Sequence, residues 1–188
     1  MFVKATFLLV LAAIVSVING QLSQVGRCPG NVKSVEYLDI EKYMGTWHEY
    51  CKYPVYFEAN GKCVSAQYSL NSDGSVRVLN SLINIKNNVS EVIDGSANLI
   101  SPGKLYVKFP VSGGYSISSN YWVLDTDYEN YAVVYSCNPL GAYAHSTIAW
   151  ILTRERIPDP KYIQKAVGVL RENGILMREM KITNQMAC

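Results

Sequence analysis

The feature that most constrains the fold is a series of short runs in which apolar and polar residues alternate, each closed by a turn signal. Alternation with a period of two is typical of β-strands with one buried face. Turn-forming sequences such as Asn71–Gly74 and Ser101–Gly103 separate neighbouring runs. The eight runs cover residues 47–51, 63–70, 75–84, 91–100, 104–111, 121–125, 131–137 and 146–153. Joined by short turns, they predict an all-β fold, an eight-stranded up-and-down antiparallel barrel.

One segment near the C-terminus breaks this pattern and predicts an α-helix. Asp159 is suited to cap its first turn and Pro160 to occupy its first helical position. Gly174 is suited to end it. Apolar residues recur at helical spacing between these signals, at Ile163, Ala166, Val167 and Leu170. We expect this helix to pack on the outside of the barrel.

The first twenty residues resemble an export signal. Lys4 gives a positive start, Phe7–Val15 is apolar, and small or polar residues follow up to Gly20. We therefore expect a signal peptide over residues 1–20, one domain over residues 21–188, and a secreted, extracellular protein. A membrane anchor is the alternative, but the apolar stretch is short for a membrane span.

The charge and the residue content argue against several classes of function. The chain has 17 basic and 15 acidic residues, a formal charge of +2, and the basic residues are scattered. Nucleic acid is therefore a poor candidate partner. His48 and His145 are the two histidines, too few for a metal centre at sensible spacing, and no glycine-rich phosphate loop occurs. The sequence therefore predicts no enzyme activity and no metal site.

Cysteine content supports an oxidising compartment. The five cysteines are Cys28, Cys51, Cys63, Cys137 and Cys188. Four can form two disulfides and one remains. The count alone does not choose among the possible pairings.

Three short motifs, in order along these strands, resemble the lipocalin family. Gly45-Thr46-Trp47 stands at the start of the first strand, Thr126-Asp127-Tyr128 in the turn after the sixth, and Arg154 at the end of the eighth. The resemblance implies that Trp47 and Arg154 close the barrel floor, by a guanidinium stacked on an indole. It also implies disulfides Cys28–Cys137 and Cys63–Cys188.

Within the family, the resemblance is strongest to the group that contains apolipoprotein D and the insect Lazarillo-type lipocalins. Insect bilin-binding proteins and insecticyanins are the near neighbours. The segments that carry this likeness include Phe57–Cys63, Tyr121–Leu124, Thr126–Cys137 and Ala149–Leu152.

Strand alternation then predicts which side chains face the interior of the barrel. We expect a small hydrophobic ligand, such as a fatty acid or steroid, to contact Cys51, Ala66, Tyr68, Val78, Asn80, Tyr121, Val123, Val134 and Trp150. Tyr68, Asn80 and Trp150 match pocket positions in the resembling group. Two alternatives stay open: the side chains fill a barrel without a cavity, or the ligand is a biliverdin-type chromophore.

Three further features carry predictions. Cys51 has the parity of Trp47, which places it on the cavity wall, either as an inert buried thiol or as one that contacts the ligand or forms an intermolecular bridge. Asn88-Val89-Ser90 is an acceptor for N-linked glycan. Val55-Tyr56-Phe57, in the first loop at the open end, could form a lid or touch a membrane transiently. The sequence does not indicate the oligomeric state.

Overall fold

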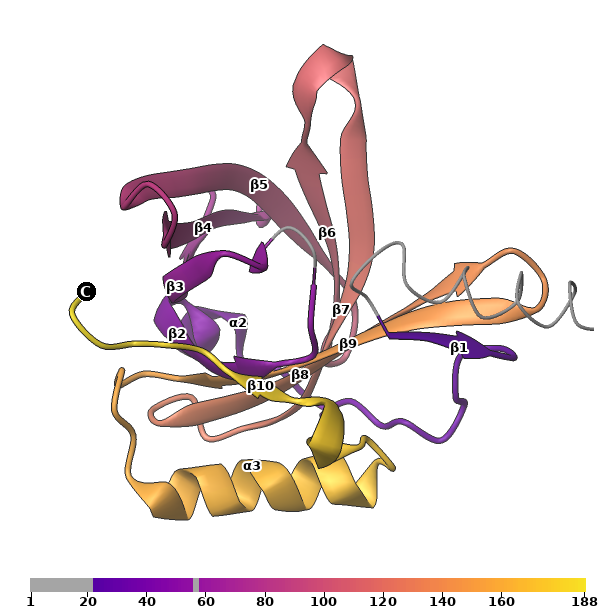
Figure 1. Cartoon of the computed structure of the whole chain (residues 1–188). Coiled ribbons are helices and arrows are strands. Elements are labelled where there is room, and N and C mark those ends of the chain that lie inside the picture. Colours follow the sequence, from indigo (N-terminus) through magenta and orange to yellow (C-terminus); the bar gives the residue numbers. More distant parts are fainter. Residues whose placement is uncertain (1–21, 56–57) are drawn as a thin grey trace, which may run out of the picture.

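The strands of this chain close into a barrel. The computed structural model describes residues 22–55 and 58–188. The barrel strands are β2 (Gly45–Lys52), β3 (Gly61–Leu70), β4 (Val76–Asn84), β5 (Val89–Ser101), β6 (Lys104–Pro110), β7 (Ser116–Thr126), β8 (Tyr131–Leu140) and β9 (Ala144–Thr153). Each pairs antiparallel with the next, and β9 pairs with β2 (Figure 1). The predicted eight-stranded antiparallel barrel is therefore confirmed.

Two short strands and a short helix were not predicted. The strand β1 (Leu22–Val25) adds to the far end of β9, and β10 (Lys181–Ile182) adds to the end of β2. The helix α2 (Ile40–Tyr43) lies just before β2. Two 3-10 turns, Ser112–Gly114 and Met177–Glu179, complete the list. The predicted signal segment, residues 1–20, lies outside the described residues.

Strand pairing sorts the side chains into two apolar clusters, one on each side of the barrel wall. The inner cluster fills the floor half of the barrel and includes Trp47, Val78, Val123 and Val134. The outer cluster lies between the wall and the C-terminal helix and includes Val133 and Leu170. On β8, Ala132 and Val134 belong to the inner cluster while Tyr131 and Val133 belong to the outer one, as a period of two requires.

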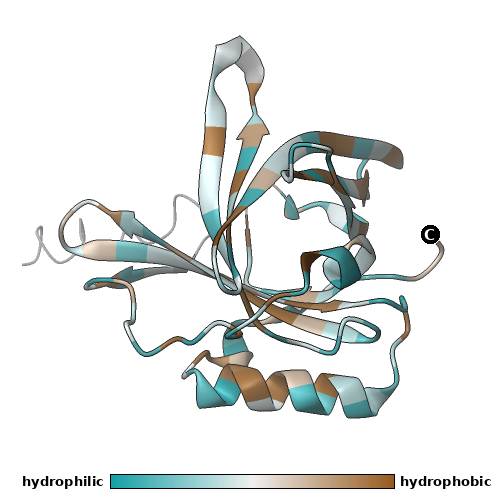
Figure 2. Cartoon of the chain, turned by 180° about the vertical axis from the view of Figure 1, so that it is seen from behind, coloured by the Kyte–Doolittle hydropathy of each residue, from teal (hydrophilic) through white to brown (hydrophobic). Residues whose placement is uncertain are grey.

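The helix α3 (Pro160–Glu172) has the start and stop that the sequence predicts. Asp159 accepts a hydrogen bond from the backbone N–H of Lys161 at 2.9 Å. Past the end of the helix, Gly174 has a φ of +71°, and the N–H of Ile175 bonds the carbonyl of Leu170 at 2.9 Å. Apolar residues alternate with hydrophilic ones along the helix, and Ala166 and Leu170 are buried against the barrel (Figure 2). Within the described residues, none of the helices is both long and apolar enough to cross a membrane.

Two disulfides fasten the ends of the chain to the barrel. Cys28 is bonded to Cys137 on β8, and Cys63 on β3 to Cys188, which are the pairings that the resemblance implied. The bonds span 109 and 125 residues of chain. Loops of that length correspond to about 4 to 5 kcal/mol each in the chain-entropy account.

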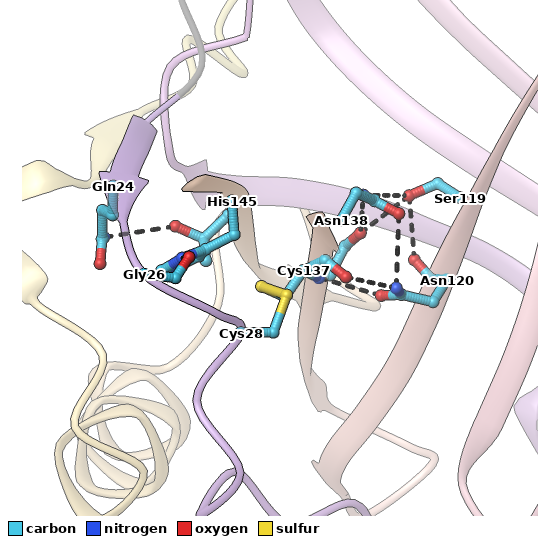
Figure 3. The surroundings of a disulfide bond; sticks show 10 residues. Gln24, Gly26, Cys28, Ser119, Asn120, Cys137, Asn138 and His145 are labelled. Carbon is cyan, nitrogen blue, oxygen red and sulfur yellow. Dashed lines mark hydrogen bonds between the residues drawn. A yellow bond between two sulfur atoms is a disulfide. The ribbon is translucent and has the colours of Figure 1, made fainter. Parts of the chain in front are cut away.

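The first disulfide belongs to a larger fastening of the N-terminal arm. Figure 3 shows Cys28 reaching Cys137 beside a group of polar side chains on β7 and β8, among them Ser119, Asn120 and Asn138. On the other side of the arm, the ring of His145 bonds the carbonyl of Gly26 at 2.9 Å. The arm is thereby held to the β8–β9 hairpin, which extends well beyond the barrel wall (Figure 1).

Candidate functional site

The floor of the barrel is closed by Arg154 stacked on Trp47. The guanidinium carbon lies 3.7 Å from the centre of the Trp47 ring. The same guanidinium donates hydrogen bonds of 2.8 to 3.0 Å to four carbonyls, those of Lys42, Met44, Thr46 and Tyr128. Gly45 has a φ of +96°, which residues with a side chain rarely adopt, and a Cβ at this position would lie 3.2 Å from the Arg154 guanidinium. Both facts favour glycine here. One side chain thus joins α2, β2 and the turn after β7.

The turn after β7 is rigid because its side chains bond its own backbone. Asp127 Oδ1 accepts from the N–H groups of Glu129, Asn130 and Tyr131 at 2.8 to 3.2 Å. Thr126 Oγ1 accepts from the N–H of Tyr128 at 2.9 Å and donates to the carbonyl of Tyr131 at 2.8 Å. This turn presents the Tyr128 carbonyl to Arg154, so it is part of the floor.

Above the floor, three tyrosines share a hydrogen-bonded cluster inside the barrel. The hydroxyl of Tyr121 lies 2.8 Å from that of Tyr43 and 3.0 Å from that of Tyr68. Burial raises the pKa of Tyr68 to about 12 and the pKa values of Tyr43 and Tyr121 well above their usual range. The Trp150 ring stacks 6.4 Å from that of Tyr121. The cluster is therefore neutral, aromatic and rich in hydroxyl groups.

The interior changes from filled to open along each strand. On β4, Val76 and Val78 are 1% and 2% exposed, whereas Asn80 and Leu82 are only partly buried. On β5, Ala97 is fully buried and Ile93 is 39% exposed. Their cross-strand partners show that all six side chains face the interior. Asn80 and Leu82 lie on a strand that is paired on both sides, so their exposure comes from inside the barrel. The barrel is therefore a cup that opens away from Arg154.

Eight of the nine predicted ligand-contact residues face this interior. They are Ala66, Tyr68, Val78, Asn80, Tyr121, Val123, Val134 and Trp150. Three of them belong to the inner cluster that fills the half of the barrel next to the floor: Val78, Val123 and Val134. Asn80 is partly buried, and its side-chain oxygen is buried without a hydrogen-bond partner among the described residues.

Cys51, the ninth, does not face the interior, and the prediction that it lines the cavity is wrong. Glu49 pairs with Leu152 and Cys51 with the next residue, Ile151, so Tyr50 is an extra residue in β2. Such a β-bulge reverses the parity of everything after it. Cys51 therefore lies in the outer cluster, against the α3 side of the wall. Burial raises the pKa of its thiol to about 12, so it is an inert packing residue.

A buried polar cluster on β2 was missed by the sequence analysis. The ammonium of Lys52 lies 2.6 Å from a carboxylate oxygen of Glu49 and also bonds Glu58. Thr183, just after β10, donates to Glu49. The same bulge explains the miss, because it turns Lys52 to the side that faces inward. The residues Leu105, Val107 and Phe109 on β6 were also missed, although their alternation was readable in the sequence.

The remaining predicted positions are Asn88 and the segment 55–57. Asn88 lies exposed in the turn between β4 and β5, with a φ of +56°. In the predicted open-end segment, Val55 is buried, and Tyr56 and Phe57 lie outside the described residues. No group of three or more potential metal ligands occurs within the two described ranges, 22–55 and 58–188.

A closed antiparallel barrel with a sealed floor and a hollow, aromatic upper half defines a protein that encloses a small molecule. Comparison with known proteins gives the family. A sequence profile of the "Lipocalin-like domain" matches residues 38–185. Apolipoprotein D of Oryctolagus cuniculus is 40% identical over 183 residues, covering 95% of this chain and 93% of the relative.

Two insect proteins extend the comparison. The Lazarillo protein of Schistocerca americana is 34% identical over 154 residues, covering 77% of this chain and 69% of the relative. The solved structure of insecticyanin from Manduca sexta superposes with a TM-score of 0.79 at 30% identity, covering 88% of this chain and 89% of that chain. The chain therefore belongs to the lipocalin family. That membership makes it a binding protein rather than an enzyme.

Proposed function

We propose that this protein is a secreted carrier that holds a fatty acid, a steroid or a similar amphipathic lipid in the open half of its barrel. The observation that carries the proposal is the graded exposure of the inward-facing residues. A filled barrel would bury Asn80 and Leu82 as completely as it buries Val76 and Val78 on the same strand. The open half therefore has room for a ligand.

The lining favours a mostly apolar ligand with one or two polar groups. Trp150, Tyr121 and Ala66 supply aromatic and apolar surface, and the unpartnered oxygen of Asn80 can accept one hydrogen bond. The ammonium of Lys52 is already paired with Glu49 and Glu58, so that cluster offers no free positive charge. A lipid with a hydroxyl donor matches this inventory.

A binding titration with a fluorescent fatty acid and a retinoid tests this assignment of the pocket. Trp150→Ala should weaken binding of both while the circular dichroism of the barrel is unchanged, because Trp150 supplies lining surface without closing the floor. Trp122→Phe is the control, since Trp122 lies on the outside beneath Lys104. Equal affinities for Trp150→Ala and the wild type would contradict the assignment of the pocket.

The second candidate ligand is a biliverdin-type pigment, favoured by the structural likeness to insecticyanin. An absorption spectrum of the purified protein separates the two. A blue-green protein with visible absorption favours the pigment, whereas a colourless protein that takes up fatty acid favours the lipid.

Export, glycosylation and contact with membranes belong to the same proposal. Export is supported by the segment 1–20 and by the two disulfides, and the exposed Asn88 would carry a glycan. The loops of the open end present exposed apolar residues, which supports transient contact with a lipid surface. These residues are Ile85, Tyr115, Leu140 and Tyr143. Co-sedimentation with liposomes tests that contact.

A further inference from the structure

The barrel wall is not joined along the full length of β5 and β6. β5 pairs with β6 only from Ser96 to Ser101, and its first seven residues, 89–95, pair only with β4. Beyond Lys108, β6 pairs only with β7. The β6–β7 hairpin accordingly leans away from the β4–β5 hairpin toward the open end (Figure 1). The two strand edges that face each other here keep unpaired backbone groups.

A cleft of about 370 Å³ occupies the place where the two strands separate. Its lining comes from all three strands around the split: Asp94, Gly95, Ser96, Lys108, Pro110 and Ser116. The cleft is thus formed by the wall of the barrel and not by the mouth of the cup. Its volume falls in the range of small-molecule sites, which begins at about 300 Å³.

One aromatic ring stands between this cleft and the interior. Phe109 pairs with Ile117, faces inward, and packs against the inner cluster. A Cβ built on Gly95 would lie only 2.4 Å from Phe109 Cδ1, so the ring rests directly on the Gly95 backbone. Any side chain at Gly95 would push the ring away. Rotation of this partly buried ring would connect the cleft to the hollow of the barrel.

The charges around the cleft favour an anion. Asp94 is held by Arg77, which donates to both carboxylate oxygens at 3.1 and 2.5 Å. Lys108 is exposed, and no carboxylate of the described chain lies within ion-pair distance of it. The cleft therefore has one unmatched positive charge. Unpaired N–H groups on the edge of β5 add hydrogen-bond donors that a carboxylate can use.

We propose that the cleft is a lateral portal and headgroup site for a lipid with a carboxylate. The carboxylate lies at Lys108, and the hydrocarbon chain passes Phe109 into the barrel. This inference rests on the proposed carrier function and adds one ligand class to it, ionised fatty acids that enter through the wall. A neutral lipid would use the same path but would lack the contact with Lys108.

The headgroup site is tested with cis-parinaric acid and its methyl ester, which share one fluorescent chain. Lys108→Gln should weaken binding of the acid about 3- to 10-fold and leave binding of the ester unchanged. Lys165→Gln on α3 removes the same charge from an exposed position far from the split, and should change neither. If Lys108→Gln binds the acid as tightly as the wild type does, the headgroup site is refuted.

The portal is tested by association rates in stopped-flow mixing. Phe109→Ala should speed uptake of both probes and Phe109→Trp should slow it, because the ring blocks the path. Equal rates in all three proteins would refute the portal. If the wild type binds neither the acid nor the ester, the carrier function itself fails; if it binds both and only the Lys108 and Phe109 effects are missing, the carrier function stands and the portal falls.

Discussion

Among single residues, Asn80 has a polar side chain inside the barrel that packing alone does not explain. Its neighbours on the inner face of β4, Val78 and Leu82, are apolar, yet it brings a buried oxygen that finds no partner among the described residues. A buried unpaired acceptor costs about 1 to 3 kcal/mol. A bound ligand that donates to this oxygen would recover much of that cost, which makes Asn80 a specificity residue in the proposed site.

Replacing Asn80 by leucine should therefore separate stability from binding. We expect Asn80→Leu to leave the protein as stable or stabilise it by about 1 kcal/mol, because the unpaired oxygen is gone. It should weaken binding of a steroid alcohol several-fold more than that of the corresponding deoxy steroid. Asn98→Leu, on the exposed face of β5, is the control and should affect neither. Equal losses for the two steroids would exclude a hydrogen bond at Asn80.

Glu49 should make stability depend on pH in an unusual direction. Burial, reinforced by the nearby carboxylate of Glu58, raises its pKa from 4.5 to about 8, against the opposing effect of Lys52. The folded protein therefore holds a proton that the unfolded chain releases above pH 4.5. The stability from this group is complete below pH 4.5 and is lost as the pH rises through 8.

Urea unfolding between pH 5 and 8.5 measures this dependence. The free energy of unfolding of the wild type should decline over that range relative to Glu49→Gln, which has no proton to lose. Glu91→Gln is a matched control at an exposed position on β5 and should follow the wild type. Parallel pH profiles for Glu49→Gln and the wild type would show that Glu49 is ionised throughout.

At the scale of elements, the single extra residue in β2 decides which side chains meet. The strand pairs with β3 by its first half and with β9 by its second half, and Tyr50 is inserted in the second. Glu49 and Lys52 consequently share the inner face while Cys51 turns toward α3. The bulge depends on the register between β2 and β9, which lie about a hundred residues apart in the sequence. The local pattern of β2 therefore does not predict it.

Local patterns did suffice where one strand or helix determines its own structure. The eight runs, the capping of α3 by Asp159 and its end at Gly174 are all properties of neighbouring residues. The short strands β1 and β10 escaped prediction because each depends on a partner strand and a nearby disulfide. The first half of β7 escaped as well, since Ser116–Asn120 is rich in serine and has little strand preference of its own.

The helix α3 should contribute strongly to stability through its buried face. Leu170 is fully buried in the outer cluster, so Leu170→Ala should lower the free energy of unfolding by about 2 to 5 kcal/mol. Lys165→Ala, on the exposed face of the same helix, should stay within about 0.5 kcal/mol of the wild type. Thermal or urea unfolding measures both, and a small loss for Leu170→Ala would mean that the helix is only loosely attached.

At the scale of the whole molecule, the barrel is rigid at one end and open at the other. Arg154 and the turn after β7 fix the floor, and the two disulfides fix the N-terminal arm and the C-terminal tail to the wall. Between β2 and β3, the tail completes the seam, because the Gln185 amide donates to the carbonyls of Glu49 and Val64 at 2.9 and 2.8 Å. The split between β5 and β6 and the hollow interior are both on the opposite, open half.

The central claim is that this open half holds one small amphipathic molecule. Native mass spectrometry of the protein recovered from a secreting host, followed by extraction of the bound molecule, tests it most directly. We expect a mass increment equal to one lipid per chain, which is lost on extraction and restored by adding fatty acid. A spectrum with the bare chain mass, unchanged after incubation with fatty acid, steroid and bilin, would contradict the account.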